Sequence, residues 1–402
     1  MPKRGVDSEA RPAALFVTPE APYPAIGGGA LHSAGLLEYL ASRYQVDVLV
    51  FREAGARDPV AAFPDGLARE IFVIELPYHA KSPAARVVRN LGRFLRDVPP
   101  LNDRFAGFGD RIESLLRGKR YSLTVVEHFW CAPYQELLAM HCDRTVLDLH
   151  NIESRLWEAH EHTESWPLAA IYRRFHQRCL EMEREWLPKF SLLLVTSEAD
   201  AARARDIAPG ATVAIYPNTI PRISLPNRKK EGVIIFSGNL EYHPNVAAVR
   251  YFRSAIWPIL RERWPGLVWR LIGKNAQSVR RYASGDPRID LRGPVDDAIE
   301  SLAQAKVAVV PVLSGSGTRV KILEAWAAGT AVVSTRLGAE GLDGRDGEHL
   351  LIADGAGNFA SAVSKLLSSV EERERIARAG RRLYEEEYTW EAGWNKLAQI
   401  EI

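Results

Sequence analysis

The chain has 402 residues, of which 47% are hydrophobic and 25% are charged, a balance typical of a soluble globular protein with two or three domains. Its 52 basic and 50 acidic side chains give a net charge of +2, so no global field favours nucleic acid as a partner. Three cysteines without CxxC or zinc-finger spacing argue against a disulfide framework or a structural zinc, and no run of about twenty apolar residues occurs. We expect a cytoplasmic protein without a membrane span.

Short apolar runs rich in β-branched residues recur along the chain, and segments with helical spacing separate them. The runs cover residues 13–18, 46–51, 71–76, 123–128, 145–150, 192–197, 213–218, 233–238, 267–273, 289–293, 307–312, 331–335 and 349–354. Most are continuous rather than alternating, as expected for parallel strands covered by helices on both faces. The predicted fold class is therefore α/β, with doubly wound parallel sheets.

Residues 217–232, PNTIPRISLPNRKKEG, interrupt this series with prolines, asparagines and consecutive charges, which predict an exposed linker. We expect one Rossmann-like domain over residues 1–220 and a second over residues 221–385, facing each other across a cleft. Residues 386–402 have aromatic and aliphatic side chains at helical spacing. They predict a closing helix that packs back on the N-terminal domain.

The stretch SGSGTRVKILEAWAAGT, residues 314–330, places small residues between a strand and a helix. Backbone N–H groups and the helix dipole favour an anion at such a position, and Arg319 and Lys321 add two cations. Glu324 is suited to accept hydrogen bonds from two ribose hydroxyls. The pattern predicts a nucleotide diphosphate site, unless Glu324 merely pairs with Lys321 on the helix surface.

Several segments resemble, in order, those of glycosyltransferase family four. They are AIGGGALHSAGLLEYLASRY, VLDLHN, VTSEAD, YPNTIP, FSGNLEYHPNVAAVRYF, LIGKNA, the stretch above and GAEGL. The resemblance covers most of the chain and implies a GT-B fold, with an acceptor domain followed by a donor domain. It also implies transfer from a nucleotide-sugar donor with retention of configuration, without a metal or other cofactor. The expected acceptor is a glycan, a lipid-linked sugar or a small molecule, in polysaccharide or glycoconjugate biosynthesis.

The resemblance also implies roles for individual residues. His150 matches the histidine that touches the donor sugar, although a strand-end histidine can equally be a satisfied hydrogen-bonding residue. His128 is expected on the acceptor side. The donor-binding residues implied by the resemblance and by the stretch 314–330 are Gly28, Gly29, Gly238, Asn239, Ser316, Gly317, Thr318 and Glu324.

Two positions depart from the family pattern. The first glutamate of the family's E-x7-E pair is Ser316 here, which leaves open a non-catalytic protein that binds sugar nucleotides. Asn239 and Asn245 stand where the pattern has an arginine and a lysine for the diphosphate. We therefore expect Arg319 and Lys321 to supply the catalytic positive charge from the other loop. An epimerase of the same fold is a further alternative to the transferase. The missing glycine fingerprint argues against an NAD-dependent enzyme.

A further segment, residues 85–101, combines arginines with apolar residues at helical spacing. Its arginines fall on one face and an apolar stripe on another. The arginines are Arg86, Arg89, Arg93 and Arg96, and the stripe consists of Val87, Leu91, Phe94 and Val98. A solvated face over a buried stripe is one interpretation. The other is peripheral contact with an anionic membrane at its inner face, where lipid-linked acceptors reside.

Overall fold

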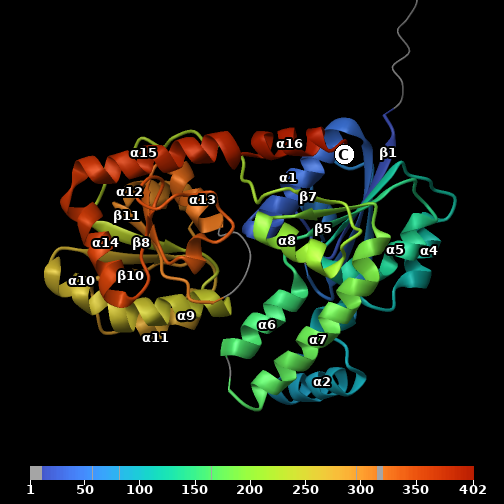
Figure 1. Cartoon of the computed structure of the whole chain (residues 1–402), viewed down its shortest axis with the longest axis horizontal. Coiled ribbons are helices and arrows are strands. Elements are labelled where there is room, and N and C mark those ends of the chain that lie inside the picture. The colour runs from blue at the N-terminus through green and yellow to red at the C-terminus, as the bar shows by residue number, and fades with distance from the viewer. Residues whose placement is uncertain (1–10, 57, 81, 164, 296, 315–319) are drawn as a thin grey trace, which may run out of the picture.

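Two parallel sheets organise the protein (Figure 1). The computed structural model describes residues 11–402 except 57, 81, 164, 296 and 315–319. The N-terminal sheet has the order β3-β2-β1-β4-β5-β6-β7. Its strands are β1 (Ala13–Thr18), β2 (Gln45–Glu53), β3 (Glu70–Leu76), β4 (Leu123–Glu127), β5 (Thr145–Leu149), β6 (Leu192–Val195) and β7 (Val213–Ile215).

The second sheet has the order β10-β9-β8-β11-β12-β13, and its strands are also parallel. They are β8 (Val233–Ser237), β9 (Val268–Ile272), β10 (Ile289–Leu291), β11 (Val307–Val310), β12 (Ala331–Ser334) and β13 (Leu351–Ile352). Each of the thirteen predicted apolar runs overlaps one of these strands; eleven runs contain the whole strand, and β2 and β3 extend beyond theirs. The prediction of two doubly wound parallel sheets is confirmed.

Alternating side chains of the first sheet enter two different cores. Phe16 packs with α1 (Gly28–Arg43) and α16 (Trp390–Gln399) on one face. Leu15 packs on the other face with residues of α4 (Gly109–Leu116), α5 (Gln135–Ala139), α7 (Leu168–Trp186) and α8 (Glu198–Ile207). Helices on both faces explain why these strands are continuous apolar runs.

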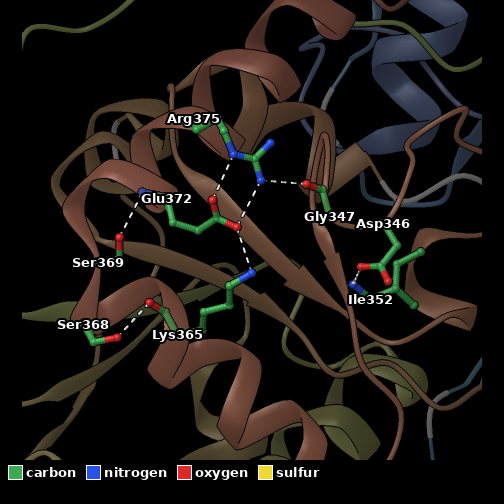
Figure 2. Close-up of polar contacts among 8 residues, drawn as sticks. All are labelled: Asp346, Gly347, Ile352, Lys365, Ser368, Ser369, Glu372 and Arg375. Carbon is green, nitrogen blue, oxygen red and sulfur yellow. Dashed lines mark hydrogen bonds and ion pairs between the residues drawn. The ribbon is translucent and has the colours of Figure 1, made fainter.

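The helices of the second half pack on its sheet, and their buried side chains form one continuous core with those of the strands. These helices are α9 (His243–Tyr251), α10 (Trp257–Arg263), α11 (Arg280–Ala283), α12 (Ala298–Gln304), α13 (Val320–Ala327), α14 (Ala356–Ser368) and α15 (Val370–Glu387). The outer junction of α14 and α15 is held by ionic contacts (Figure 2). Glu372 accepts hydrogen bonds from Arg375 and Lys365, which lower its pKa to about 2, and Arg375 also donates to the Gly347 carbonyl.

The chain crosses between the two halves twice, and the crossings run side by side. Residues 217–232 form no helix or strand apart from an isolated bridge between Ile220 and Thr389, and Thr219 and Ile220 are buried, unlike the exposed segment expected there. Beyond this bridge, α16 packs on α1 of the first half (Figure 1). Trp394 donates to the Gly35 carbonyl at 2.8 Å, and a Cβ on Gly35 would lie 2.6 Å from the indole nitrogen of Trp390. Glycine at position 35 therefore allows the close contact between these helices.

Helix α2 (Pro83–Arg96) differs from the predicted solvated arginine face over a buried stripe. Arg93 is buried, and its Nε donates to Asp103 at 2.8 Å. Leu91, expected in the buried stripe, is instead exposed. The side chains of Arg86 and Val87 lie outside the described residues. Among the described helices, none combines the length and apolar character needed to span a bilayer.

Candidate active site

The N-terminal half carries a buried cluster of acids and histidines at the carboxyl ends of β4 and β5. Glu127 ends β4, Asp148 lies beside it in β5, and His150 follows β5. These three residues come together because the carboxyl ends of parallel strands meet at one edge of the sheet. His32 reaches the same point from α1, and its Nε2 lies 3.0 Å from Asp148 Oδ2. His150 Nε2 lies 3.4 Å from both Asp148 Oδ2 and Glu127 Oε1. Two buried carboxylates therefore surround one imidazole.

These contacts set the charge of His150. Burial alone lowers the pKa of an imidazole, but the hydrogen bonds to Asp148 and Glu127 outweigh it and raise the pKa of His150 to about 10. Burial would likewise raise the pKa of Asp148, yet His32 and His150 hold it below its usual range. His150 is therefore an imidazolium at neutral pH, held between two carboxylates.

His128 stacks on His150 and provides the next layer of the cluster. The two rings have centroids 3.8 Å apart, and on its other side His128 stacks on Trp130 at 4.2 Å. Burial lowers the pKa of His128 well below its usual value, with His150 as a further cause, so this ring is neutral. Its backbone has a φ of 60°, a conformation uncommon for residues other than glycine and frequent at functional sites.

The cluster has the composition of a metal site as well. His32, Asp148 and His150 each offer one ligand atom, and these atoms lie within 4.8 Å of one another. Three such ligands are the number that a catalytic zinc uses. A metal ion here has to displace the proton that His150 holds between its two carboxylates, because metal ligation needs the neutral imidazole. The contacts in this structure are those of a hydrogen-bonded cluster.

The C-terminal half contributes two loops that contact through their backbones. Gly238 follows β8 with a φ of 143°, and Gly273 follows β9 with a φ of 140°. A Cβ on Gly273 would lie 1.7 Å from the Gly238 carbonyl oxygen, so both positions depend on glycine. The carbonyl of Asn239 accepts a hydrogen bond from the Asn245 amide at 2.8 Å, which fixes the loop against α9.

Lys321 of α13 reaches into this loop. Its Nζ donates to Asn245 Oδ1 at 2.6 Å and lies 4.3 Å from the centre of the Phe236 ring. A Cβ on Gly238 would be 3.3 Å from the same Nζ. The cation carried by α13 therefore lies beside the loop after β8. The other residues predicted between β11 and α13 lie outside the described residues: Ser316, Gly317, Thr318 and Arg319.

Glu324 lies one turn beyond Lys321 on the same partly exposed face of α13. Burial raises its pKa to about 7, against the opposing effect of Lys321. The alternative, in which Glu324 only pairs with Lys321 on the helix surface, does not describe this arrangement, because Lys321 Nζ donates to Asn245 Oδ1. Glu324 is a carboxylate in a partly desolvated setting, where a strong hydrogen-bond donor such as a ribose hydroxyl stabilises its charged form.

The amino ends of α1 and α13 approach each other between the two halves. Gly27, with a φ of 100°, precedes α1 and makes no side-chain cap. A Cβ on Gly28 would lie 3.1 Å from Val320 Cγ2, the first residue of α13, and a Cβ on Gly29 would lie 4.0 Å from His150 Nδ1. The glycine loop thus brings the N-terminus of α1 close both to the start of α13 and to His150. Arg155 of α6 (Glu153–Thr163) also bridges the halves through an ion pair with Glu340.

A cavity of about 910 Å³ lies in the N-terminal half. Its lining is largely apolar and includes Leu76, Leu101 and Phe105. Glu20, just after β1, belongs to the lining, and burial raises its pKa, while His150 opposes the shift and Glu127 adds to it. The lining residue Phe105 stacks on Trp130, with ring centroids 5.7 Å apart, and Trp130 stacks on His128, so these rings connect one wall of the cavity with the histidine cluster.

Three members of the cluster were not predicted from the sequence: His32, Glu127 and Asp148. A usable signal was present for the two acids, because a single carboxylate inside an otherwise apolar parallel strand is rarely buried without a partner. His32 carries no comparable signal, since its partner lies 116 residues away in the chain.

Comparison with known proteins connects this geometry with an enzyme family. Residues 231–369 match the family model described as glycosyl transferases group 1. A protein from the cps region of Klebsiella pneumoniae is 22% identical over 373 residues, covering 89% of this chain and 92% of that protein. The phosphatidyl-myo-inositol mannosyltransferase of Mycolicibacterium smegmatis is 28% identical over 233 residues, covering 55% of this chain and 56% of that enzyme.

Solved structures extend the likeness to the whole fold. Sucrose-phosphate synthase from Thermosynechococcus elongatus superimposes with a TM-score of 0.72 at 18% identity, covering 97% of this chain and 98% of that one. Anabaena HepE in complex with UDP and glucose gives a TM-score of 0.63 at 13% identity, covering 97% and 99%. Residues 231–369 are therefore similar to the glycosyl transferases of group 1, and nearly the whole chain shares the fold of these solved structures.

Proposed function

We propose that this protein is a glycosyltransferase that moves a sugar from a nucleotide-sugar donor to an acceptor with retention of configuration and without a metal ion. The observation that carries the proposal is Lys321 Nζ, 2.6 Å from Asn245 Oδ1, beside the Gly238 loop. A cation at the meeting point of a glycine loop and two helix N-termini suits a diphosphate. The UDP bound in the HepE complex supports a donor of this class.

In this proposal the chain's own groups stabilise the leaving diphosphate. Lys321 and the N-terminus of α1 place positive charge where negative charge develops as the sugar–phosphate bond breaks. Glu324 accepts hydrogen bonds from the ribose, which orients the nucleotide. With the donor fixed, the acceptor hydroxyl approaches the same face of the sugar, and the departing phosphate takes its proton. No protein side chain is assigned as the general base.

His150 serves the donor sugar in the same proposal. The imidazolium is fixed by Asp148 and Glu127 through Nε2, while Nδ1 lies on the side of Gly29. A donor N–H held there can bond a sugar hydroxyl or a phosphate oxygen without reorganisation during the reaction. His128, stacked on His150, belongs to the acceptor side.

The acceptor half of the reaction is assigned to the cavity beside Glu20. The stacked rings of Phe105 and Trp130 connect it with the histidine cluster, and its 910 Å³ is large enough for a sugar with an attached group. The Klebsiella pneumoniae relative comes from a cps region, which supports a role in assembling a polysaccharide or another glycoconjugate.

Thermal unfolding with a panel of nucleoside diphosphates and nucleotide sugars in EDTA tests the donor site. A ligand at one hundred times its dissociation constant stabilises the fold by about 2.7 kcal/mol. We expect one nucleotide to stabilise the wild type and to lose most of this effect in Glu324→Ala. Lys306→Ala is the matched control, because Lys306 precedes β11 at the opposite end of the same sheet. Stabilisation of neither wild type nor variant by any nucleotide would contradict the donor site.

Turnover separates the enzyme from a protein that only binds the nucleotide. Release of the nucleoside diphosphate from the donor that binds is expected in EDTA, either slowly to water or faster with an acceptor. Binding without any release would favour the non-catalytic alternative. A requirement for added divalent metal would contradict metal independence. The group formed by His32, Asp148 and His150 would then be the candidate metal site.

A further inference from the structure

Helix α2 exposes an apolar stripe that folding of the described chain does not explain. The stripe consists of Val88, Leu91 and Leu95, which are 71%, 56% and 72% exposed. Their spacing of three and four residues places them on one face of the helix. Single exposed apolar residues are ordinary, but an aligned set of large ones marks a surface that meets something apolar.

The charges around the stripe are positive. Residues 83–96 contain four arginines and no acidic side chain. Arg93 and Arg96 share one carboxylate, that of Asp103, so this group keeps a net positive charge. The Arg96 side chain is 61% exposed. A cationic border around an apolar stripe is the pattern of helices that lie in the surface of an anionic membrane.

A neighbouring segment adds an exposed indole at the same end of the domain. Helix α7 packs on α2, since Arg174 donates to Asp97 at 2.7 Å and lies 4.5 Å from the centre of the Phe94 ring. The connection leading into α7 carries Trp166, which is 84% exposed. Figure 1 shows α2 and the turn between α6 and α7 at one end of the N-terminal half. Tryptophan is enriched where membrane proteins meet the lipid headgroups.

The large cavity connects this end of the molecule with the catalytic cluster. Arg93 of α2 belongs to its lining, as do Pro100 and Leu101 of α3 (Pro100–Phe105) just after it. Phe105, the last residue of α3, also lines the cavity and stacks on Trp130, the ring that stacks on His128. An apolar chain that enters beside α2 therefore has a largely apolar path towards the reacting groups.

We propose that the apolar stripe and Trp166 dock on an anionic membrane surface, and that the acceptor is lipid-linked, with the first part of its chain in the cavity. The membrane contact refines the arginine face inferred from the sequence, since the apolar residues enter the lipid and the exposed Arg96 borders it, whereas Arg93 is buried. The acceptor class rests on the proposed glycosyltransferase function, whereas the membrane contact can be measured without it.

Sedimentation with vesicles tests the docking surface. The full chain is mixed with vesicles of phosphatidylcholine alone or with 30 mol% phosphatidylglycerol, a composition on the order of an anionic leaflet. We expect binding to the anionic vesicles, at least tenfold weaker binding for Leu91→Ser/Leu95→Ser, and about fivefold weaker binding for Arg96→Gln. The matched control is Met140→Ser/Val370→Ser, which changes two residues of similar exposure elsewhere.

Different outcomes identify different failures. If the wild type ignores anionic vesicles while a nucleotide still stabilises it, membrane docking is wrong and the donor site stands. If vesicles bind but no nucleotide does, docking stands and the proposed function is wrong. Concentration-dependent dimerisation that Leu91→Ser/Leu95→Ser abolishes, without vesicle binding, would show that the stripe is a contact between two copies of the chain.

A soluble isoprenoid probes the cavity. Farnesyl diphosphate is expected to bind the wild type, and Ala62→Trp, which narrows the cavity at an exposed lining residue, is expected to weaken binding at least tenfold. Inorganic diphosphate serves as the control for the charged group alone. Equal affinity of both compounds, or equal binding by wild type and Ala62→Trp, would overturn a lipid chain in this cavity.

Discussion

Lys321 Nζ donates to Asn245 Oδ1 at 2.6 Å, so a cation from α13 lies in the loop region that follows β8. The sequence places Asn239 and Asn245 there instead of the basic residues of the family pattern. The contact supports the prediction that α13 supplies the missing charge. It brings together two residues that are 76 positions apart in the chain.

Loss of this cation is predicted to weaken donor binding. Lys321→Ala is expected to lower the affinity for the nucleotide by about 1.5–3 kcal/mol, the range of hydrogen bonds to charged groups. Isothermal titration with the nucleotide that binds in the thermal screen measures the change. Lys306→Ala should keep wild-type affinity. If Lys321→Ala also keeps it, the charge does not come from α13 at this position.

Glu324 is predicted to make both stability and donor affinity depend on pH. Its pKa is raised from 4.5 to about 7 in the folded protein, so the folded state holds the proton more tightly than the unfolded chain. Stability therefore falls as the pH rises between these two values, by up to about 3 kcal/mol. Glu324→Gln should unfold at the same denaturant concentration as the wild type at pH 4, and at a higher one at pH 8.

The donor affinity should change in the opposite direction. Only ionised Glu324 is a full acceptor for ribose hydroxyls, so affinity for a nucleotide sugar should rise with pH through about 7 in the wild type. Glu324→Gln should show weaker binding with little change over the same interval. A wild-type affinity that does not vary between pH 6 and 8 would remove Glu324 from the ribose site.

The sequence predicted the fold better than the site, for a physical reason. Continuous apolar runs follow directly from burial on both faces of a parallel sheet, so each strand, such as β5, could be read locally. The contacts of Asp148 with His32 and His150 depend on how α1 lies across the sheet. The sequence predicted that Lys321 supplies positive charge for the diphosphate. Its contact with Asn245 could not be predicted, because it depends on how α13 packs beside the loop after β8.

The carboxylate of Asp148, which contacts both His32 and His150, is predicted to hold His150 in its charged form. Asp148→Asn should lower the pKa of His150, measured from its ring nitrogen signals by NMR, and reduce turnover. Breaking a buried ionic contact should also lower the free energy of unfolding by about 3–5 kcal/mol. Asp47→Asn is the matched control, since Asp47 is equally buried in β2 and pairs with Arg69 far from the cleft. It should lose stability and keep the His150 pKa and turnover.

The close approach of Gly28 to Val320 is predicted to be necessary for a closed cleft. Gly28→Ala introduces a Cβ only 3.1 Å from Val320 Cγ2, so the Val320 side chain or the helix ends that carry the two residues must shift by a few tenths of an ångström. We expect about a tenfold loss in kcat/KM, because a small displacement of the groups around the diphosphate weakens its stabilisation. Val320→Ala removes the methyl groups concerned, so Gly28→Ala/Val320→Ala should recover most of the activity. A double variant as impaired as Gly28→Ala would show that the added methyl acts on the ligand or on α1 itself, and that the contact between the two helix ends is not what limits the reaction.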